Sequence, residues 1–136
     1  MIIRELHDQA MDTMIDAMRA HQLGEEEKSI SAYEKAFELE NQAALLALAN
    51  ENTTVMTWSV LCRSAAWLAI QAELFDEAEK LALTALARGA HPEEKARLVD
   101  VLFVALKKQG YQLLSTEEEN ANATAKSIEE RELVSV

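Results

Sequence analysis

The sequence is poor in residues that end or bend secondary structure. It contains three glycines and one proline in 136 residues, about 3% of the chain where average usage is roughly 12%. Sandwiches and barrels of short antiparallel strands need a turn about every 8–12 residues. The scarcity of both residues therefore excludes these all-β folds.

Cysteine and basic residues are also scarce. The single cysteine, Cys62, can form neither an internal disulfide nor a cysteine-based zinc site. Thirteen basic residues against 24 acidic ones give a net charge of −11, whereas proteins that bind nucleic acids or anionic membranes need positive charge. We expect no nucleic acid, no membrane and no cofactor among the partners.

Long apolar runs are missing as well. The longest uninterrupted run, residues 43–49, is far shorter than the ~20 residues that cross a bilayer. The first residues do not have the basic and apolar segments of a signal peptide. Both observations predict a cytoplasmic protein.

The residues that are abundant favour helices. Ala, Leu, Glu, Lys and Arg make up 73 of the 136 residues, which is typical of long helices. Caps and apolar spacing predict an all-α fold of stacked antiparallel hairpins with about five helices. The first predicted helix is residues 3–21, and the second is a helix of about 22 residues that begins after Glu27. The third is residues 57–71, the fourth is capped by Asp76 and ends at Gly89, and the fifth runs from Pro92 to Lys108.

The helices place residues 1–114 in one domain and leave residues 115–136 as an acidic tail. The tail has six acidic residues, two basic residues and few large apolar side chains. Such a composition is typical of disordered segments, so deleting the tail should change the melting temperature little.

Two stretches resemble each other and the tetratricopeptide repeat. In the second, Phe75 stands at the position of the repeat's turn aromatic, and the Asp-Glu-Ala of residues 76–78 stands at the start of its second helix. In the first, Gly24 matches the turn glycine, and Ala36 occupies the small position that corresponds to Ala85. The resemblance implies a protein-interaction module that receives an extended peptide on the first helix of each pair.

The sequence also departs from that repeat. The corresponding alanines lie 49 residues apart rather than about 34. Cys62 occupies the family's tryptophan position, and the second unit has no turn glycine. Residues 57–81 resemble, in addition, a segment of short uncharacterised bacterial helical proteins. That match retains Arg63 and Ser64 and implies a bacterial origin, with no activity attached.

The residue types needed for catalysis are not grouped in the sequence. His7 and His21 lie about 21 Å apart along one helix, so they cannot share a metal. His91 precedes Pro92 and is typical of a helix start, and Cys62 on an apolar helix is typical of a buried thiol. With no motif for a nucleophile, a phosphate or a metal, we expect neither an enzyme nor a metal site.

Arg63, Trp67 and Gln71 lie one turn apart on the most apolar helix. A charged residue there needs water, an acidic partner or a ligand. A salt bridge to a neighbouring helix would satisfy Arg63 within the chain; alternatively, the row binds a peptide with an acidic end in a helical groove. The flanking basic residues on the fifth helix are Arg97, Lys107 and Lys108. The leading hypothesis is therefore a non-catalytic adaptor or scaffold that binds a protein or peptide partner.

The alternative is a structural or regulatory homodimer that binds no peptide. The fifth helix has more apolar residues than one packing face requires: Leu98, Val99, Val101, Leu102, Phe103, Val104 and Leu106. The last helix of a stack usually has a polar outer surface. We therefore expect the remainder to be covered by a second copy, or by Tyr111, Leu113 and Leu114 of the same chain.

Overall fold

The computed structural model describes residues 2–111, which form five α-helices and no strand. The helices are α1 (Ile2–Gln22), α2 (Glu26–Ala49), α3 (Val55–Gln71), α4 (Phe75–Ala87) and α5 (Pro92–Lys108). The prediction of an all-α fold with about five helices is confirmed. None of these helices is long and apolar enough to cross a membrane. The predicted tail, residues 115–136, lies outside the described residues.

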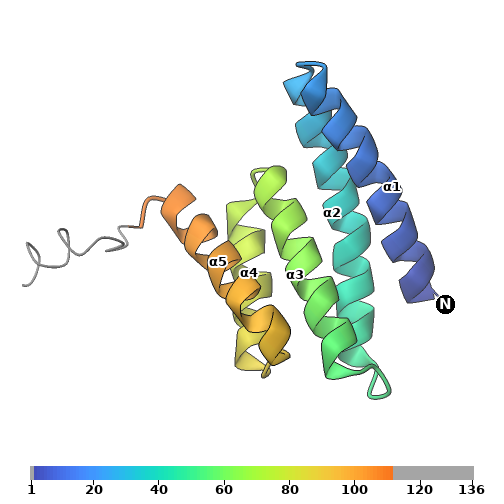
Figure 1. Ribbon diagram of the computed structural model, residues 1–136, viewed down its shortest axis with the longest axis vertical. Coiled ribbons are helices and arrows are strands. Elements are labelled where there is room, and N and C mark those ends of the chain that lie inside the picture. Colours follow the sequence, from blue (N-terminus) through green and yellow to red (C-terminus); the bar gives the residue numbers. More distant parts are fainter. Residues whose placement is uncertain (1, 112–136) are drawn as a thin grey trace, which may run out of the picture.

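Successive helices pack beside one another and alternate in direction (Figure 1). α1 packs on α2, α2 on α3 and α3 on α4, and α5 contacts both α4 and α3. α1, α3 and α5 run in one direction, and α2 and α4 run in the other (Figure 1). The arrangement places α1, α3 and α5 so that side chains from these three helices can share a surface.

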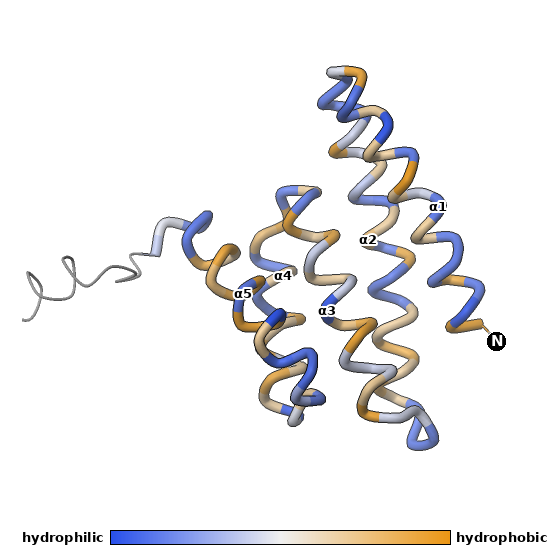
Figure 2. The backbone as a smooth tube through the Cα atoms, in the orientation of Figure 1, coloured by the Kyte–Doolittle hydropathy of each residue, from blue (hydrophilic) through white to orange (hydrophobic). Residues whose placement is uncertain are grey.

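Small residues dominate the core. Fifteen of the 24 buried hydrophobic residues in the described chain are alanines, and alanine lets neighbouring helix backbones approach closely. Larger side chains, such as Phe37, Trp58, Leu68 and Leu98, fill the space between the alanine contacts. Hydrophobic residues recur along all five helices (Figure 2).

Four of the helices end with the same backbone pattern. Shortly after each of these helices ends, one residue has a positive φ. These residues are Gly24, Glu73, Gly89 and Gly110. The N–H of the following residue donates to a carbonyl five residues earlier, as Leu74 does to Ala69 at 2.8 Å. This is a Schellman-type end, which normally takes glycine. Glu73, with φ of 62°, occupies the turn position at which the predicted second unit has no glycine.

Several helix starts differ from the sequence predictions. α2 begins at Glu26 rather than after Glu27. α3 begins at Val55 rather than at residue 57, because the Thr54 hydroxyl accepts a hydrogen bond from the Thr57 N–H at 3.2 Å. The prediction that Asp76 caps α4 is wrong. Leu74 holds the cap position without a side-chain bond, and Asp76 lies in the first turn, where the helix dipole still favours its charge.

The start of α5 agrees with the prediction. His91 caps the helix, since its Nδ1 accepts a hydrogen bond from the Glu93 N–H at 3.2 Å. Pro92 occupies the first helical position, where its missing N–H costs nothing. The predicted role of His91 as a helix-start residue is confirmed.

Candidate interaction surface

α3 is buried on all sides except one. Met56, Val60, Arg63, Trp67 and Gln71 follow one another at helical spacings of four, three, four and four residues, and each is at least partly exposed. We call these five residues the α3 row. Most of the other α3 residues between 58 and 69 are buried. The predicted residues Arg63, Trp67 and Gln71 therefore do share one exposed strip.

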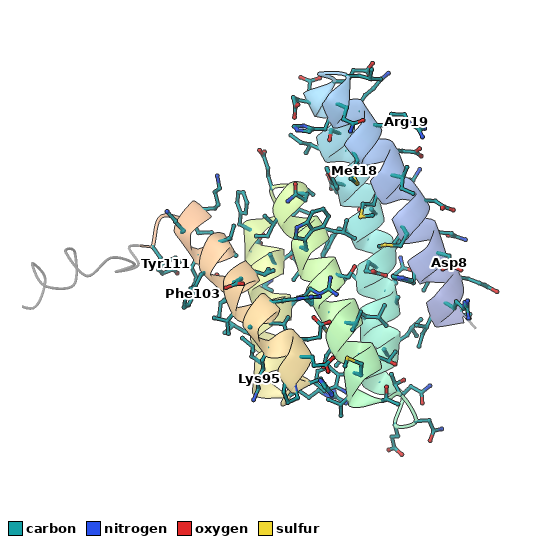
Figure 3. The ribbon with its side chains drawn as sticks, viewed as in Figure 1. Asp8, Met18, Arg19, Lys95, Phe103 and Tyr111 are labelled. Carbon is teal, nitrogen blue, oxygen red and sulfur yellow. The ribbon has the colours of Figure 1, made fainter. Side chains whose placement is uncertain are left out.

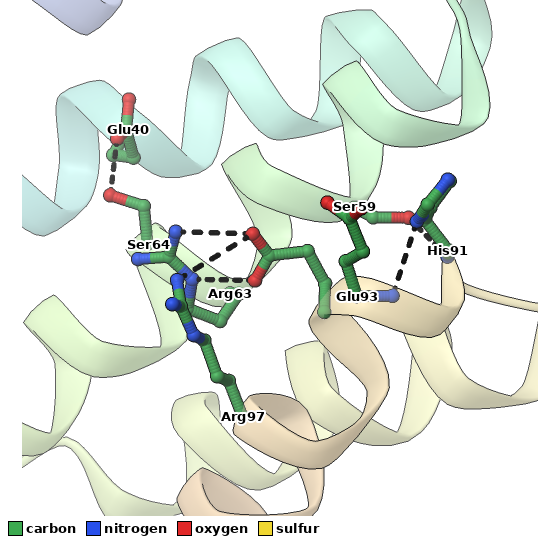
Figure 4. A network of polar contacts seen from close by, with 8 residues as sticks. Glu40, Ser59, Arg63, Ser64, His91, Glu93 and Arg97 are labelled. Atoms are coloured by element: carbon green, nitrogen blue, oxygen red, sulfur yellow. Dashed lines mark hydrogen bonds and ion pairs between the residues drawn. The ribbon is translucent and has the colours of Figure 1, made fainter.

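Arg63 is held by an ion pair with α5 (Figure 4). Its Nε donates to Oε2 of Glu94 at 3.0 Å, and a terminal guanidinium nitrogen donates to Oε1 at 3.4 Å. Glu94 is buried, and a guanidinium nitrogen of Arg97 lies 3.9 Å from its Oε1. Of the two hypotheses for Arg63, the structure shows the salt bridge to a neighbouring helix. Arg97 remains well exposed beside it.

Trp67 contacts an aromatic residue of α2 and is partly exposed to solvent. Its ring meets the Tyr33 ring of α2 in a T-shaped contact, with centroids 6.0 Å apart and planes at 81°. Tyr33 is buried, and burial raises the pKa of its hydroxyl. Trp67 is 37% exposed, so part of its aromatic surface is open to a partner.

The predicted basic residues of α5 do not all lie together. Arg97 joins Arg63 around Glu94. Lys107 and Lys108 are exposed in the last turn of α5, at least 13 residues and thus roughly 20 Å beyond Glu94 along the helix axis. This distance separates them from Arg63, but it places them towards the Gln71 end of the α3 row, because α3 and α5 run in the same direction (Figure 1).

A groove between α1 and α3 extends the α3 row. It has a volume of about 430 Å³ and is lined by Ile3, Arg4, His7, Met56, Thr57, Val60 and Leu61. Met56 and Val60 belong to both the α3 row and the groove wall. No acidic residue lines this α1–α3 groove, although the protein has a net charge of −11.

Two other grooves lack this combination of apolar walls and basic groups. The groove on the outer side of α1 and α2, about 400 Å³, is lined mainly by polar residues, including Asp12 and Glu38. The groove where α1 begins and α2 ends, about 450 Å³, has Ile2 and Leu46 in its wall but no charged residue. Of the three, only the α1–α3 groove presents both kinds of contact.

A buried carboxylate joins the three helices around this groove. Glu40 of α2 has no exposed surface, and both of its oxygens lie 2.9 Å from Nδ1 of His7 on α1. The Ser64 hydroxyl on α3 donates to Oε2 of Glu40 at 2.6 Å, as Figure 4 shows. This network was not predicted from the sequence. Its signal was the spacing of Glu40 from Phe37 and Ala36, which places an acid on the buried face of α2.

The remaining reactive groups are placed for structure. Cys62 is fully buried, and burial raises the pKa of its thiol to about 11 against the opposing effect of the Arg88 charge. The Ser64 hydroxyl donates to the buried Glu40 carboxylate and so takes part in the contact between α3 and α2. Within residues 2–111, no three His, Cys, Asp or Glu side chains form a group that could hold a metal ion.

Comparison of the chain with protein-family models, with curated proteins and with solved structures found no match. The resemblance to the tetratricopeptide repeat therefore stays a prediction. Any function must be inferred from the α3 row, the α1–α3 groove and the chemistry of their side chains.

Proposed function

We propose that this protein is a non-catalytic interaction module that binds a peptide segment of a protein partner. The ligand would lie in the α1–α3 groove and along the α3 row. One observation carries the proposal: the only open strip of an otherwise buried helix runs from the groove wall at Met56 and Val60 to Trp67. Alternating helix directions and small residues between helices support a tetratricopeptide-like stack, in which such a strip would be the inner face.

The lining residues define the chemistry of the ligand. Ile3, Met56 and Val60 suit an apolar side chain, and methionine adapts its shape to different ligands. Arg4 lines the groove and Arg97 is exposed near the middle of the α3 row. Because no carboxylate lines the groove, an acidic group on the ligand meets attraction there and repulsion over much of the remaining surface. We expect a peptide with apolar and acidic residues close together.

The walls of this surface are fixed before a ligand arrives. Glu40 holds α1 and α3 to α2 through His7 and Ser64. The Arg63–Glu94 ion pair holds α5 to α3, and the Ser59 hydroxyl accepts a hydrogen bond from the His91 N–H at 2.9 Å. A rigid surface loses less conformational entropy on binding, which favours affinity. Trp67 adds one of the residue types that dominate interaction hot spots.

The proposal can be tested by selecting peptides from a random display library on the full-length protein. Selected peptides should combine apolar and acidic residues, and calorimetry should measure their affinity for four proteins. We expect Val60→Glu and Trp67→Ala each to weaken binding about tenfold or more. The parent and Ile15→Glu, a change at an exposed apolar residue of α1 outside the groove, should bind equally.

Circular dichroism must first show that all four proteins are equally helical. If the selected peptides bind Val60→Glu and Trp67→Ala as tightly as the parent, the α1–α3 groove is not the site. If repeated selections enrich no sequence at all, the assignment of a peptide-binding function is wrong.

A further inference from the structure

The outer side of α5 is apolar in its middle. Phe103, Val104 and Tyr111 are 52%, 42% and 58% exposed. Phe103 and Tyr111 lie at the edge of the bundle that faces away from α1 and α2 (Figure 3). Scattered exposed hydrophobic residues are common, but Phe103 and Val104 on α5, with Tyr111 just beyond its end, indicate a contact surface. Of the residues predicted as an alternative cover for α5, Tyr111 is itself exposed, and Leu113 and Leu114 lie outside the described residues.

Polar residues on this side limit what can cover it. Ala96, Asp100, Phe103 and Lys107 recur at spacings of four, three and four residues and are all exposed. We call these four residues the α5 row. It lies opposite the helix face that Leu98 and Ala105 bury. Asp100 precedes Phe103 by one turn and Lys107 follows it by one turn, so the row has an acid and a base on either side of an apolar centre.

The charge of α5 differs from that of the whole protein. α5 has three acidic and four basic residues, whereas the chain has a net charge of −11. Two copies of so acidic a protein repel each other over much of their surfaces. The α5 row, with one charge of each sign, is a surface where a second copy can approach without that penalty.

We propose that two copies of this chain associate through their α5 rows, in antiparallel orientation about a two-fold axis next to Phe103 and Val104. In that register Phe103 of one protomer contacts the partner's Val104, and Asp100 lies opposite the partner's Lys107. Each contact occurs twice because a two-fold interface is self-complementary. In an antiparallel copy the order of acid, apolar centre and base is reversed. The acid of each row therefore lies opposite the base of the other, and the two apolar centres meet.

This inference goes beyond the proposed function and does not depend on it. The α5 row shares no residue with the α3 row or with the lining of the α1–α3 groove. A partner peptide could therefore bind to either a monomer or a dimer, and each proposal can fail without the other.

Sedimentation of the full chain over about 1–200 µM tests the association. We expect the mass to rise from the 15.2 kDa of one chain towards twice that value. Phe103→Gln should weaken the dimer about tenfold or more, whereas Ile15→Gln, at an equally exposed residue of α1, should not change it. Asp100→Lys should weaken the dimer by placing a lysine opposite the partner's Lys107. Adding Lys107→Asp to that variant should restore it.

The rescue is specific to the proposed register, because residues 100 and 107 of one helix are too far apart to pair directly. A single-chain mass at every concentration would overturn the proposal, as would a dimer that neither Phe103→Gln nor Asp100→Lys weakens. A monomer in which Phe103→Cys reacts much more slowly with a maleimide than Ile15→Cys would assign the surface to another segment of the same chain. That result, too, would overturn it.

Discussion

Removal of the Glu40 carboxylate should destabilise the fold more than removal of any exposed acid on α2. Glu40 is fully buried and accepts hydrogen bonds from His7 and Ser64. Hydrogen bonds to a charged group contribute about 1.5–3 kcal/mol each, so Glu40→Ala loses about 3–6 kcal/mol. Part of this is offset, because the variant no longer buries a carboxylate, which itself costs several kcal/mol. We expect a net loss of about 2 kcal/mol in the free energy of unfolding.

Urea denaturation followed by circular dichroism measures this loss. Glu38→Ala is the matched control, because Glu38 is an exposed acid two residues away on the same helix, and its change should be within about 0.5 kcal/mol. A double-mutant cycle of Glu40→Ala with Ser64→Ala should give a coupling energy of about 1 kcal/mol. If Glu40→Ala costs no more than Glu38→Ala, the network does not hold the three helices together and the reasoning is refuted.

Three further predictions concern the thiol and the helix ends. Burial raises the pKa of Cys62 from 9.0 to about 11, so the unfolded thiol ionises first as the pH rises. The free energy of unfolding should therefore fall by roughly 2–3 kcal/mol between pH 9 and pH 11. In Cys62→Ala the free energy of unfolding should not show this contribution to the decrease. Gly89→Ala should lose about 1 kcal/mol in urea denaturation, since φ is 87° and no atom lies within 4 Å of the added Cβ; Gly89→Asn should lose less. Glu73→Gly should gain about 0.5–1 kcal/mol, because glycine adopts the φ of 62° without strain; a loss in that assay would contradict the assignment of strain to this turn.

Most of the fold could be predicted from the sequence because its signals are local. Glycine after a helix and proline at its first position act within one turn of chain. The helix ends at Gly24 and Gly89 and the helix start at Pro92 were predicted from them. The turn at Glu73 could not be predicted, because no sequence signal indicates that a glutamate adopts a left-handed conformation. The start of α4 was misplaced for the same reason: the turn bond of Leu74, not the side chain of Asp76, determines where that helix begins.

The candidate surface was only partly predictable. Helical spacing was enough to place Arg63, Trp67 and Gln71 on one strip, because the periodicity of a helix does not depend on its neighbours. The partner of Arg63 could not be predicted, because Glu94 is 31 residues away and only the packing of α5 on α3 brings the two side chains together. The distance of Lys107 and Lys108 from Arg63 depends on the same packing. Contacts between distant helices are therefore what the sequence left open here.

The two proposals together have a consequence that neither has alone. A dimer through the α5 rows would carry two α1–α3 grooves on one particle. A partner with two peptide segments, or two copies of the partner on one surface, would then bind more tightly than the single-groove affinity allows, because the second contact becomes intramolecular. Weak binding of an isolated peptide would thus be compatible with firm binding of the whole partner. Asp100→Lys separates the effects: it should lower the affinity for a two-segment ligand while leaving the affinity for a single peptide unchanged.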